Sequence, residues 1–184
     1  MLLPLSGQVS NLTDRIRNAV GPKKGMRNDV IGRFCKLACS DNFRGVYPVD
    51  RLPHKITARP SFIIIVNLGR VDGKKRFFGD TALPPGHFVT VIATPSSVHY
   101  IDPFGLPVQS DLMSKFLYYC NRRIRVNRKQ IQSKKSNYCG LYCILFACYA
   151  DGLGNDLKLE FFINKESLKR NDALCSKYLI RMFN

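Results

Sequence analysis

The chain has 184 residues, of which 45% are hydrophobic and 11% aromatic, enough to form the core of one folded domain. A disordered chain is thereby excluded, because such chains lack the apolar side chains that fill a core. Lys and Arg outnumber Asp and Glu by 29 to 13, which gives a net charge of +16. This charge attracts polyanions, so nucleic acid is the expected partner. The alternatives are an acidic membrane surface and a basic protein with neither partner.

The cysteine content and the first residues bear on the compartment. Seven cysteines are an odd number, and the start, MLLPLSGQVSN, lacks the charged region and the long apolar stretch of a signal peptide. We therefore expect an intracellular protein whose thiols are mostly reduced. The apolar run SFIIIVNLG is too short to span a bilayer, so no membrane anchor is expected.

The first half of the chain contains two predicted helices and one predicted strand. Apolar residues at helical spacing predict helices over 12–20 and 28–38. In the second of these, the residues expected to face the core are Ile31, Phe34, Leu37 and Ala38. The segment RGVYPVDRLP is rich in turn-forming residues and is predicted to be a loop. The β-branched run 61–67 is typical of a buried central strand, and a long connection over 68–86 follows it.

A hairpin is predicted next. Strands over 87–93 and 98–102 are joined by the turn TPSS. Ser110 is the expected N-cap of a helix that extends to Cys120, and 124–127 is a predicted short strand.

Two further helices complete the chain. The stretch 138–149 is apolar on all sides, which predicts a buried helix. Asn171 or Asp172 is expected to cap the last helix. Because strands and helices are mixed without regular β-α-β alternation, the predicted class is α+β.

Three residues at the ends of these elements form a candidate catalytic site. A hairpin places the start of its first strand beside the end of its second, so His87 and Asp102 are expected to meet at one edge of the sheet. A carboxylate there would orient the imidazole and stabilise its charged form. Cys139 begins the buried helix, where the helix dipole favours the nucleophilic thiolate. Gly140 is expected to let a substrate backbone approach closely.

Acyl transfer also needs donors directed at the developing oxyanion. The backbone N–H of Cys139 is one candidate, and a side-chain amide in the preceding loop is another. Gln130 and Gln132 both lie in that loop, and spacing alone does not choose between them. The alternative for both is a solvated loop residue.

Each of the three residues also has a purely structural explanation. His87 is alternatively a surface residue at a strand end, and Asp102 a turn-forming residue of the sequence DPFG. Cys139 is alternatively a small core residue, as Cys143 and Cys148 are expected to be. A zinc site is a further possibility, because FCKLAC and YCGLYC both have Cys-x₃-Cys spacing. Both pairs lie on predicted helices rather than in knuckle turns, which argues against zinc.

Four segments, in this order, resemble the adenain family of adenovirus maturation cysteine proteases and its adenovirus-like and polinton-like relatives. They are NFRGVYPVDRLPHK, IIIVNLGR, GHFVTVIATPSSVHYIDPFG and QSKKSNYCGLYCILFACYA. The order of His, acid, Gln and Cys-Gly is also that of the SUMO-deconjugating proteases, which look like distant members of one clan. The resemblance implies a papain-like fold with a central mixed sheet flanked by helices, in a single domain over 1–184. Residues 1–30 have no clear counterpart and are a possible N-terminal extension.

The resemblance also implies roles. Cys139 would be the nucleophile, His87 the general base and acid, and Asp102 the residue that orients it. The family's seven-residue step before the nucleophile chooses Gln132 as oxyanion donor. Family members cut viral precursor proteins at glycine-containing sites, in the virion and host nucleus, with viral DNA and a short viral peptide as activators. In adenain a cysteine pairs with that peptide, and Cys120 is roughly placed for this role. No metal or small-molecule cofactor is expected, and the protein is expected to be a monomer.

The charge distribution independently supports the DNA partner. No acid occurs between Asp111 and Asp151, and this segment carries many cations. The residues expected to bind phosphates without reading sequence are Arg122, Arg123, Arg125, Arg128, Lys129, Lys134 and Lys135. Lys74, Lys75 and Arg76 are expected to extend this basic surface. The alternative is a solvated basic face.

This chain departs from the family at two site positions. Phe88 follows the histidine where the family usually has Trp, and the acid is Asp102, as in the SUMO proteases, rather than the Glu frequent in adenoviruses. Two other functions therefore stay open. A deconjugase for SUMO or ubiquitin would use the same triad, whereas a non-catalytic DNA-binding protein would explain the charge but not the four site residues.

Overall fold

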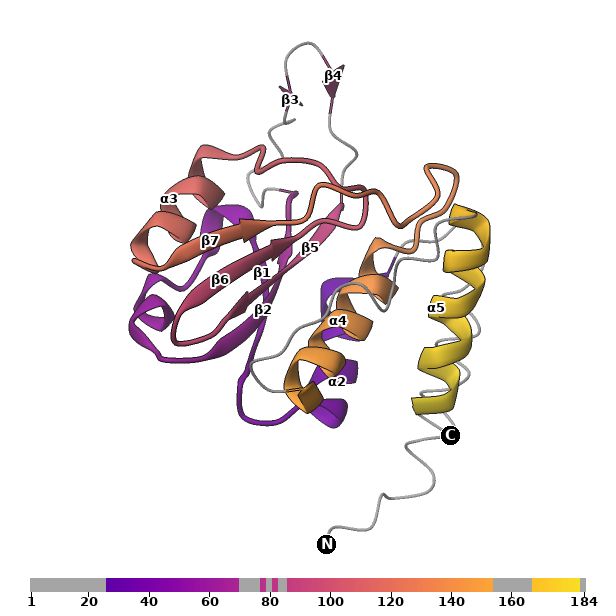
Figure 1. Cartoon of the computed structure of the whole chain (residues 1–184), viewed down its shortest axis with the longest axis horizontal. Helices are drawn as coiled ribbons and strands as arrows, with labels where there is room; N and C mark the ends of the chain where they lie inside the picture. Colours follow the sequence, from indigo (N-terminus) through magenta and orange to yellow (C-terminus); the bar gives the residue numbers. More distant parts are fainter. Residues whose placement is uncertain (1–25, 70–76, 79–80, 83–85, 154–166, 183–184) are drawn as a thin grey trace, which may run out of the picture.

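The computed structural model describes residues 26–69, 77–78, 81–82, 86–153 and 167–182. Its centre is a five-stranded mixed sheet with strand order β1-β2-β5-β6-β7 (Figure 1). The central strands β2, β5 and β6 are antiparallel to one another, whereas the outer strands β1 and β7 run parallel to their neighbours. These strands are β1 (Phe43–Pro48), β2 (Phe62–Asn67), β5 (Phe88–Ala93), β6 (Ser97–Ile101) and β7 (Arg123–Val126).

Helices cover both faces of this sheet (Figure 1). On one face lie α2 (Asn28–Ala38), α4 (Cys139–Leu153) and α5 (Leu168–Met182). On the other face lie α3 (Asp111–Tyr119) and the 3₁₀ turns η1 (Val49–Arg51) and η2 (His54–Ala58). A separate two-stranded pair, β3 (Phe77–Phe78) and β4 (Thr81–Ala82), lies in the connection between β2 and β5.

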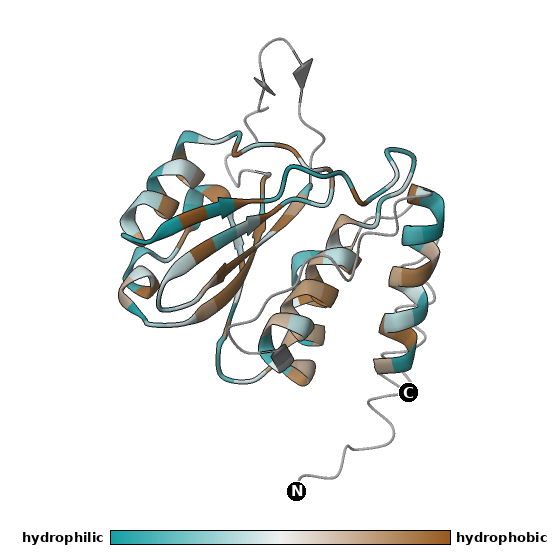
Figure 2. Ribbon diagram, viewed as in Figure 1, coloured by the Kyte–Doolittle hydropathy of each residue, from teal (hydrophilic) through white to brown (hydrophobic). Residues whose placement is uncertain are grey.

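The sheet separates two hydrophobic cores because alternate side chains of its strands point to opposite faces. Ile63 and Ile65 of β2 pack into the α4-side core, together with Phe146 of α4. Ile64 and Val66 of the same strand pack into the α3-side core. A strand buried on both faces needs a continuous apolar sequence, as β2 has. Figure 2 shows the hydrophobic residues concentrated along these central strands.

The structure confirms most predicted elements. The helix at 28–38, the central strand, the hairpin of β5 and β6, and the buried helix α4 all form where expected. Ser110 caps α3, since its hydroxyl accepts a hydrogen bond from the N–H of Met113 at 3.4 Å. Cys143 and Cys148 lie in the core as expected, with 0% and 7% of their surface exposed. The predicted helix at 12–20 lies outside the described residues.

Three structural predictions were wrong. The segment predicted as a loop at 44–53 forms most of β1 and the turn η1. As the outer strand, β1 pairs on one side only, which tolerates Pro48, and Gly45 with φ of +127° lies at an irregularity in its register. In α2 the buried stripe includes Cys35, while Leu37 is 62% exposed and Ala38 is exposed too.

The third wrong prediction concerns the last helix. It begins at Leu168, so that Asn171 and Asp172 lie within its first turns instead of capping it. The residue just before the helix, Ser167, receives the first intrahelical bond, from the N–H of Asn171 to its carbonyl at 3.0 Å. The side chains of Asn171 and Asp172 are buried and make other contacts, described below.

Candidate active site

The hairpin brings His87 and Asp102 together at one end of the sheet. His87 immediately precedes β5 and Asp102 immediately follows the antiparallel strand β6. Nε2 of His87 lies 2.9 Å from Oδ1 of Asp102, and the two side chains are 4% and 0% exposed. The carbonyl of His87 also accepts the N–H of Leu68 at 2.7 Å, which ties this end of β5 to the end of β2. A pair so buried has a defined geometry.

A second polar residue fixes the backbone of the acid. Asn127, the residue after β7, accepts the N–H of Asp102 through Oδ1 at 2.7 Å and donates from Nδ2 to the carbonyl of Asp102 at 2.7 Å. Sequence reasoning missed Asn127. Its signal was weak: an amide at the end of a predicted strand that the topology places beside the acid's own strand.

The histidine is held on its ring face and its pKa is shifted. Phe104 stacks on His87, with ring centroids 4.9 Å apart and 24° between the planes. Burial lowers the pKa of His87, but the hydrogen bond with Asp102, the nearby thiol of Cys139 and the charges of these two groups raise it more, to about 9. The imidazole is therefore mostly protonated at neutral pH. Its Nδ1 is buried and has no hydrogen-bond partner within the described ranges.

Cys139 is the first residue of α4 and is half-buried. At this position it lies beside the unpaired N–H groups of the first turn, where the helix dipole stabilises negative charge. The first turn contains no acid that would oppose this effect. Cys139 lines the same cleft as His87, so thiol and imidazole face one space.

Gly140 has a different role from the one expected. It is buried, and a Cβ atom there would lie 3.0 Å from Cδ1 of Ile31 and 3.2 Å from Cβ of Met26. The missing side chain thus allows α2 and Met26, two residues before it, to pack closely against the start of α4.

Gln132 is the amide that reaches the cleft. Its side chain is fully buried, and Nε2 donates to the carbonyl of Ser136 at 2.8 Å. Because an amide nitrogen carries two protons, one is left for another acceptor. Gln130 instead donates from Nε2 to the carbonyl of Gln132 at 2.8 Å and so supports the loop. The geometry thus separates the two glutamines that spacing could not.

These residues surround a cleft of about 260 Å³. Its lining residues are Met26, Gly86, His87, Phe88, Phe104, Gln132, Lys134, Ser136, Asn137 and Cys139. Its lining combines apolar side chains with a few polar groups and the paired imidazole and carboxylate, a combination that is typical of active sites.

The turn Asp102–Gly105 connects the acid to the amide loop. Oδ1 of Asp102 accepts the N–H of Phe104 at 2.7 Å, and its carbonyl accepts the N–H of Gly105 at 2.8 Å. The carbonyl of Pro103 accepts the N–H groups of Ile131 and Gln132 at 2.9 and 3.0 Å.

Gly105 has φ of +68°, and the backbone at positions 129–130 crosses directly over its Cα. The sequence DPFG was expected to make a turn. Its glycine is required because the loop that leads to Gln132 passes there.

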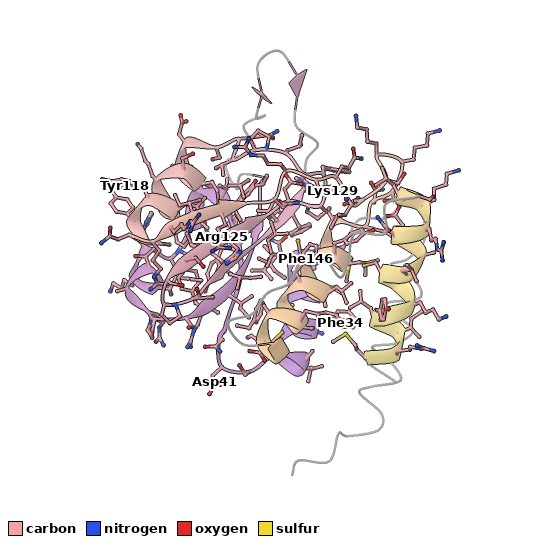
Figure 3. All side chains as sticks on the ribbon, viewed as in Figure 1. Phe34, Asp41, Tyr118, Arg125, Lys129 and Phe146 are labelled. Atoms are coloured by element: carbon pink, nitrogen blue, oxygen red, sulfur yellow. The ribbon has the colours of Figure 1, made fainter. Side chains whose placement is uncertain are left out.

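The basic residues divide into two groups. Arg123, Arg125, Arg128 and Lys129 are exposed along β7 and after it, while Lys134 and Lys135 are exposed in the loop before α4, where Lys134 lines the cleft. Arg125 and Lys129 are labelled in Figure 3. Arg122 differs, because its guanidinium donates to the carbonyl of Arg59 and is only partly exposed. Lys74, Lys75 and Arg76 lie outside the described residues.

Cys120 is not exposed as a peptide-binding thiol would need to be. It ends α3 with 4% of its surface exposed, and its thiol donates to the carbonyl of Phe116 at 3.5 Å. Burial raises the pKa of Cys120, which makes the thiol less reactive. A mixed disulfide at this position would require α3 to move.

Within the described residues, no group of three or more His, Cys, Asp or Glu side chains is arranged to hold a metal ion. The two Cys-x₃-Cys pairs lie on α2 and α4, and Cys39 contacts Cys148, with their sulfurs 3.9 Å apart. No described helix is long and apolar enough to cross a bilayer.

Comparison with solved structures identifies the fold. The SUMO protease Ulp1, in a structure with its catalytic cysteine oxidized to a sulfinic acid, matches with a TM-score of 0.51 and 11% sequence identity. The match covers 100% of this chain and 98% of that chain. The chain has a Ulp1-type cysteine protease fold. The predicted α+β class with a helix-flanked mixed sheet is thereby confirmed.

The central domain of the Lpg1148 protein from Legionella pneumophila matches with a TM-score of 0.45 and 12% identity, over 86% of this chain and 99% of that chain. A scan against protein-family models and a search of curated proteins found no match.

Proposed function

We propose that this protein is a cysteine endopeptidase with Cys139 as its nucleophile. The observation that carries the proposal is the buried pair of His87 and Asp102, 2.9 Å apart, in one cleft with a thiol at a helix N-terminus. The fold shared with a cysteine protease supports the same chemistry. A structural core cysteine would not need the adjacent charged imidazole, the glutamine amide and the open cleft.

The geometry suggests the following steps. The thiolate Sγ of Cys139 attacks the peptide carbonyl carbon, and the carbonyl oxygen takes up negative charge. The second side-chain N–H of Gln132, which does not bond Ser136, and the backbone N–H of Cys139 stabilise this charge. Protonated His87 then donates its proton to the leaving amine as the C–N bond breaks. A water molecule then gives a proton to the neutral imidazole and attacks the thioester, which releases the acid product and restores the Cys139 thiolate beside the protonated imidazole. Asp102 keeps the ring oriented and stabilises its charged form.

The proposed substrates are viral precursor proteins with glycine at the cleavage site, processed in the virion or host nucleus, and the enzyme acts as a monomer. The sequence resemblance to the adenain family supports this assignment. A deconjugase for SUMO or a ubiquitin-like protein is the second candidate, favoured by the likeness to Ulp1, a SUMO protease, and by an aspartate as the acid. Both candidates use the same chemistry on glycine-containing chains.

DNA is the proposed activator. Six exposed cations, of which Lys134 lines the cleft, would bind the enzyme to a polyanion. The six are Arg123, Arg125, Arg128, Lys129, Lys134 and Lys135. A short viral peptide as a second activator remains part of the proposal, at a site other than the buried thiol of Cys120 in its present position.

One assay tests the catalytic proposal. Cleavage of a fluorogenic peptide with glycine before the scissile bond is compared for wild type and Cys139→Ala, with and without duplex DNA, at low and high salt. We expect wild type to cleave the peptide and Cys139→Ala not to cleave it. We also expect DNA to stimulate cleavage by wild type at low salt but not at high salt. Equal cleavage by Cys139→Ala refutes the mechanism, and a stimulation that survives high salt refutes the electrostatic account. Cleavage of SUMO or ubiquitin fusions in preference to capsid-type peptides would favour the second candidate.

A further test concerns the basic surface itself. Arg125→Gln with Arg128→Gln should weaken DNA binding. The slope of log K against log salt concentration should become less steep by about 0.9 for each phosphate contact that is lost. Lys177→Gln with Arg181→Gln, which removes two exposed cations of α5, is the matched control and should have less effect. Equal effects of both changes would indicate attraction by net charge alone.

A further inference from the structure

Helix α5 buries two polar side chains against the loop that carries Gln132. Asn171 and Asp172 are 5% and 6% exposed. Nδ2 of Asn171 donates to the carbonyl of Ile131 at 3.1 Å, and Oδ1 of Asp172 accepts the N–H of Ser133 at 3.4 Å. Burying an amide and a carboxylate costs free energy unless both find partners, and here the partners are backbone groups of the loop.

Tyr142 of α4 completes this contact. Its hydroxyl lies 3.1 Å from the carbonyl of Ile131 and 3.0 Å from Oδ1 of Asp172, and its ring is fully buried. The hydroxyl therefore joins α4, which begins with the nucleophile, to both the loop and α5. We use the name α5 clamp for Tyr142, Asn171 and Asp172.

The loop is thus held from two sides. On the sheet side the carbonyl of Pro103 accepts the N–H groups of Ile131 and Gln132. On the helix side the α5 clamp takes the carbonyl of Ile131 and the N–H of Ser133. The backbone groups on both sides of Gln132 are therefore hydrogen-bonded, and its side chain has little freedom to leave the cleft.

We propose that the α5 clamp positions Gln132 for oxyanion stabilisation, and this inference rests on the proposed protease function. An oxyanion donor has to lie within about 3 Å of the developing charge, so a displacement of the loop by about 1 Å removes most of its effect. The members of the clamp do not touch substrate. They are positioning residues, while His87 and Asp102 are held by Phe104 and Asn127, which are not members of the clamp.

The test compares Asp172→Ala, Asp172→Asn and Gln132→Ala. Three quantities are measured: kcat for the fluorogenic peptide, affinity for a peptide aldehyde with glycine at its end, and the rate of Cys139 alkylation by iodoacetamide. The aldehyde adduct places an oxygen at the oxyanion position, whereas alkylation needs only the thiol and the imidazole. Ser176→Ala is the matched control, because its buried hydroxyl on the same helix donates to the carbonyl of Asp172 and does not contact the loop.

We expect Asp172→Ala to lower kcat and aldehyde affinity by about tenfold or more. The upper limit is the 10²- to 10³-fold loss that is typical of complete removal of an oxyanion donor. Alkylation should be unchanged. Asp172→Asn keeps an acceptor oxygen and should retain most activity. Adding Asp172→Ala to Gln132→Ala should cost nothing more, because the amide to be positioned is already gone. Additive losses, or a fall in alkylation as large as the fall in kcat, would overturn the inference.

Amide hydrogen exchange provides a readout that does not depend on activity. Asp172→Ala should accelerate exchange at Ile131, Gln132 and Ser133 and leave the strands beside His87 protected, whereas Ser176→Ala should do neither. Unchanged exchange at these loop amides would contradict the inference that the α5 clamp holds the loop. A wild-type protein that cleaves no peptide, but whose loop exchange responds to Asp172→Ala, would refute the proposed function and leave the structural clamp intact.

Discussion

Replacing Gly105 with alanine should destabilise the protein and slow catalysis together. A Cβ atom at this position would lie 2.5 Å from the carbonyl carbon of Lys129 and 2.6 Å from the nitrogen of Gln130. Normal contact between carbon atoms begins near 3.5 Å, so the crossing segment would have to move by about 1 Å. That segment leads within two residues to Gln132, whose N–H is bonded to the same turn.

The expected magnitude follows from these contacts. A left-handed residue with a Cβ costs about 1–2 kcal/mol, and overpacking against backbone adds about 1–3 kcal/mol. The less flexible unfolded chain of the alanine variant offsets about 0.4–1 kcal/mol. We therefore expect the free energy of unfolding to fall by about 2–4 kcal/mol. A loop displaced by about 1 Å should lower kcat by about 10- to 100-fold, less than complete loss of the oxyanion donor.

Two other glycines serve as controls. Gly86 also has a positive φ, +80°, but a Cβ there would meet no atom within 4 Å, so Gly86→Ala should show the backbone strain alone. Gly152 lies in α4 without close neighbours, and alanine there should leave stability equal or raise it by about 0.5–1 kcal/mol. Denaturant unfolding gives the stabilities, and cleavage of the fluorogenic peptide gives kcat.

Two results would contradict the reasoning. If Gly105→Ala loses no more stability than Gly86→Ala, the crossing segment does not pack on Gly105 as described. If stability falls as expected while kcat per folded molecule is unchanged, the turn does not control the position of Gln132.

Three other predictions concern the acid, its support and a second thiol. Asp102→Asn should lower the pKa of His87 from about 9, as followed by NMR of the imidazole, and a pKa that stays near 9 would assign the shift to Cys139. Because the pKa of His87 is raised on folding, its protonation stabilises the folded state by an amount of order 3 kcal/mol. This stabilisation is complete below about pH 6.5 and is lost as the pH rises through 9. Over this pH range the free energy of unfolding of wild type should therefore fall more than that of Asp102→Asn. Asn127→Ala removes both side-chain bonds to the acid's backbone and should cost about 1–3 kcal/mol of stability with a fall in kcat; an unchanged kcat would show that Asp102 keeps its place without them. Hydrogen bonding with Cys148 and Cys35 lowers the pKa of Cys39 to about 5. Mass mapping after iodoacetamide treatment near pH 6.5 should therefore find Cys39 modified before the buried thiols, and modification of Cys148 first would contradict this pKa shift.

The positions of His87 and Asp102 could be predicted from sequence because they follow from the geometry of a hairpin. The short turn TPSS makes β5 and β6 an antiparallel hairpin, which brings the start of β5 and the end of β6 to one end of the sheet, where His87 and Asp102 meet. The start of α4 was equally predictable, since an abrupt change from polar to apolar residues marks it at Cys139. The fold class followed from the same pattern of elements.

What sequence reasoning missed shares a physical cause. Asn127 and Asp172 act by hydrogen bonds from a side chain to the backbone of a segment far away in the chain, and such bonds leave no periodic pattern. The helix-capping preference of Asn and Asp even pointed to a wrong role for Asp172. Strand β1 was missed because an outer strand tolerates the glycine and proline that otherwise mark loops. Gln132 and Gln130 could be separated only by seeing which amide enters the cleft.

The two separate cores have a consequence for which substitutions the proposed active site tolerates. His87 and Asp102 belong to the sheet, while Cys139 belongs to a helix that packs on one face of that sheet only. A change of side-chain volume between α4 and the sheet, at Phe146 for example, would alter the separation of thiol and imidazole as well as the stability. The same change at Phe116, in the α3-side core, would alter stability while leaving the turnover of each folded molecule nearly unchanged. Substitutions in the α3-side core should therefore accumulate more freely among active variants than substitutions beneath α4.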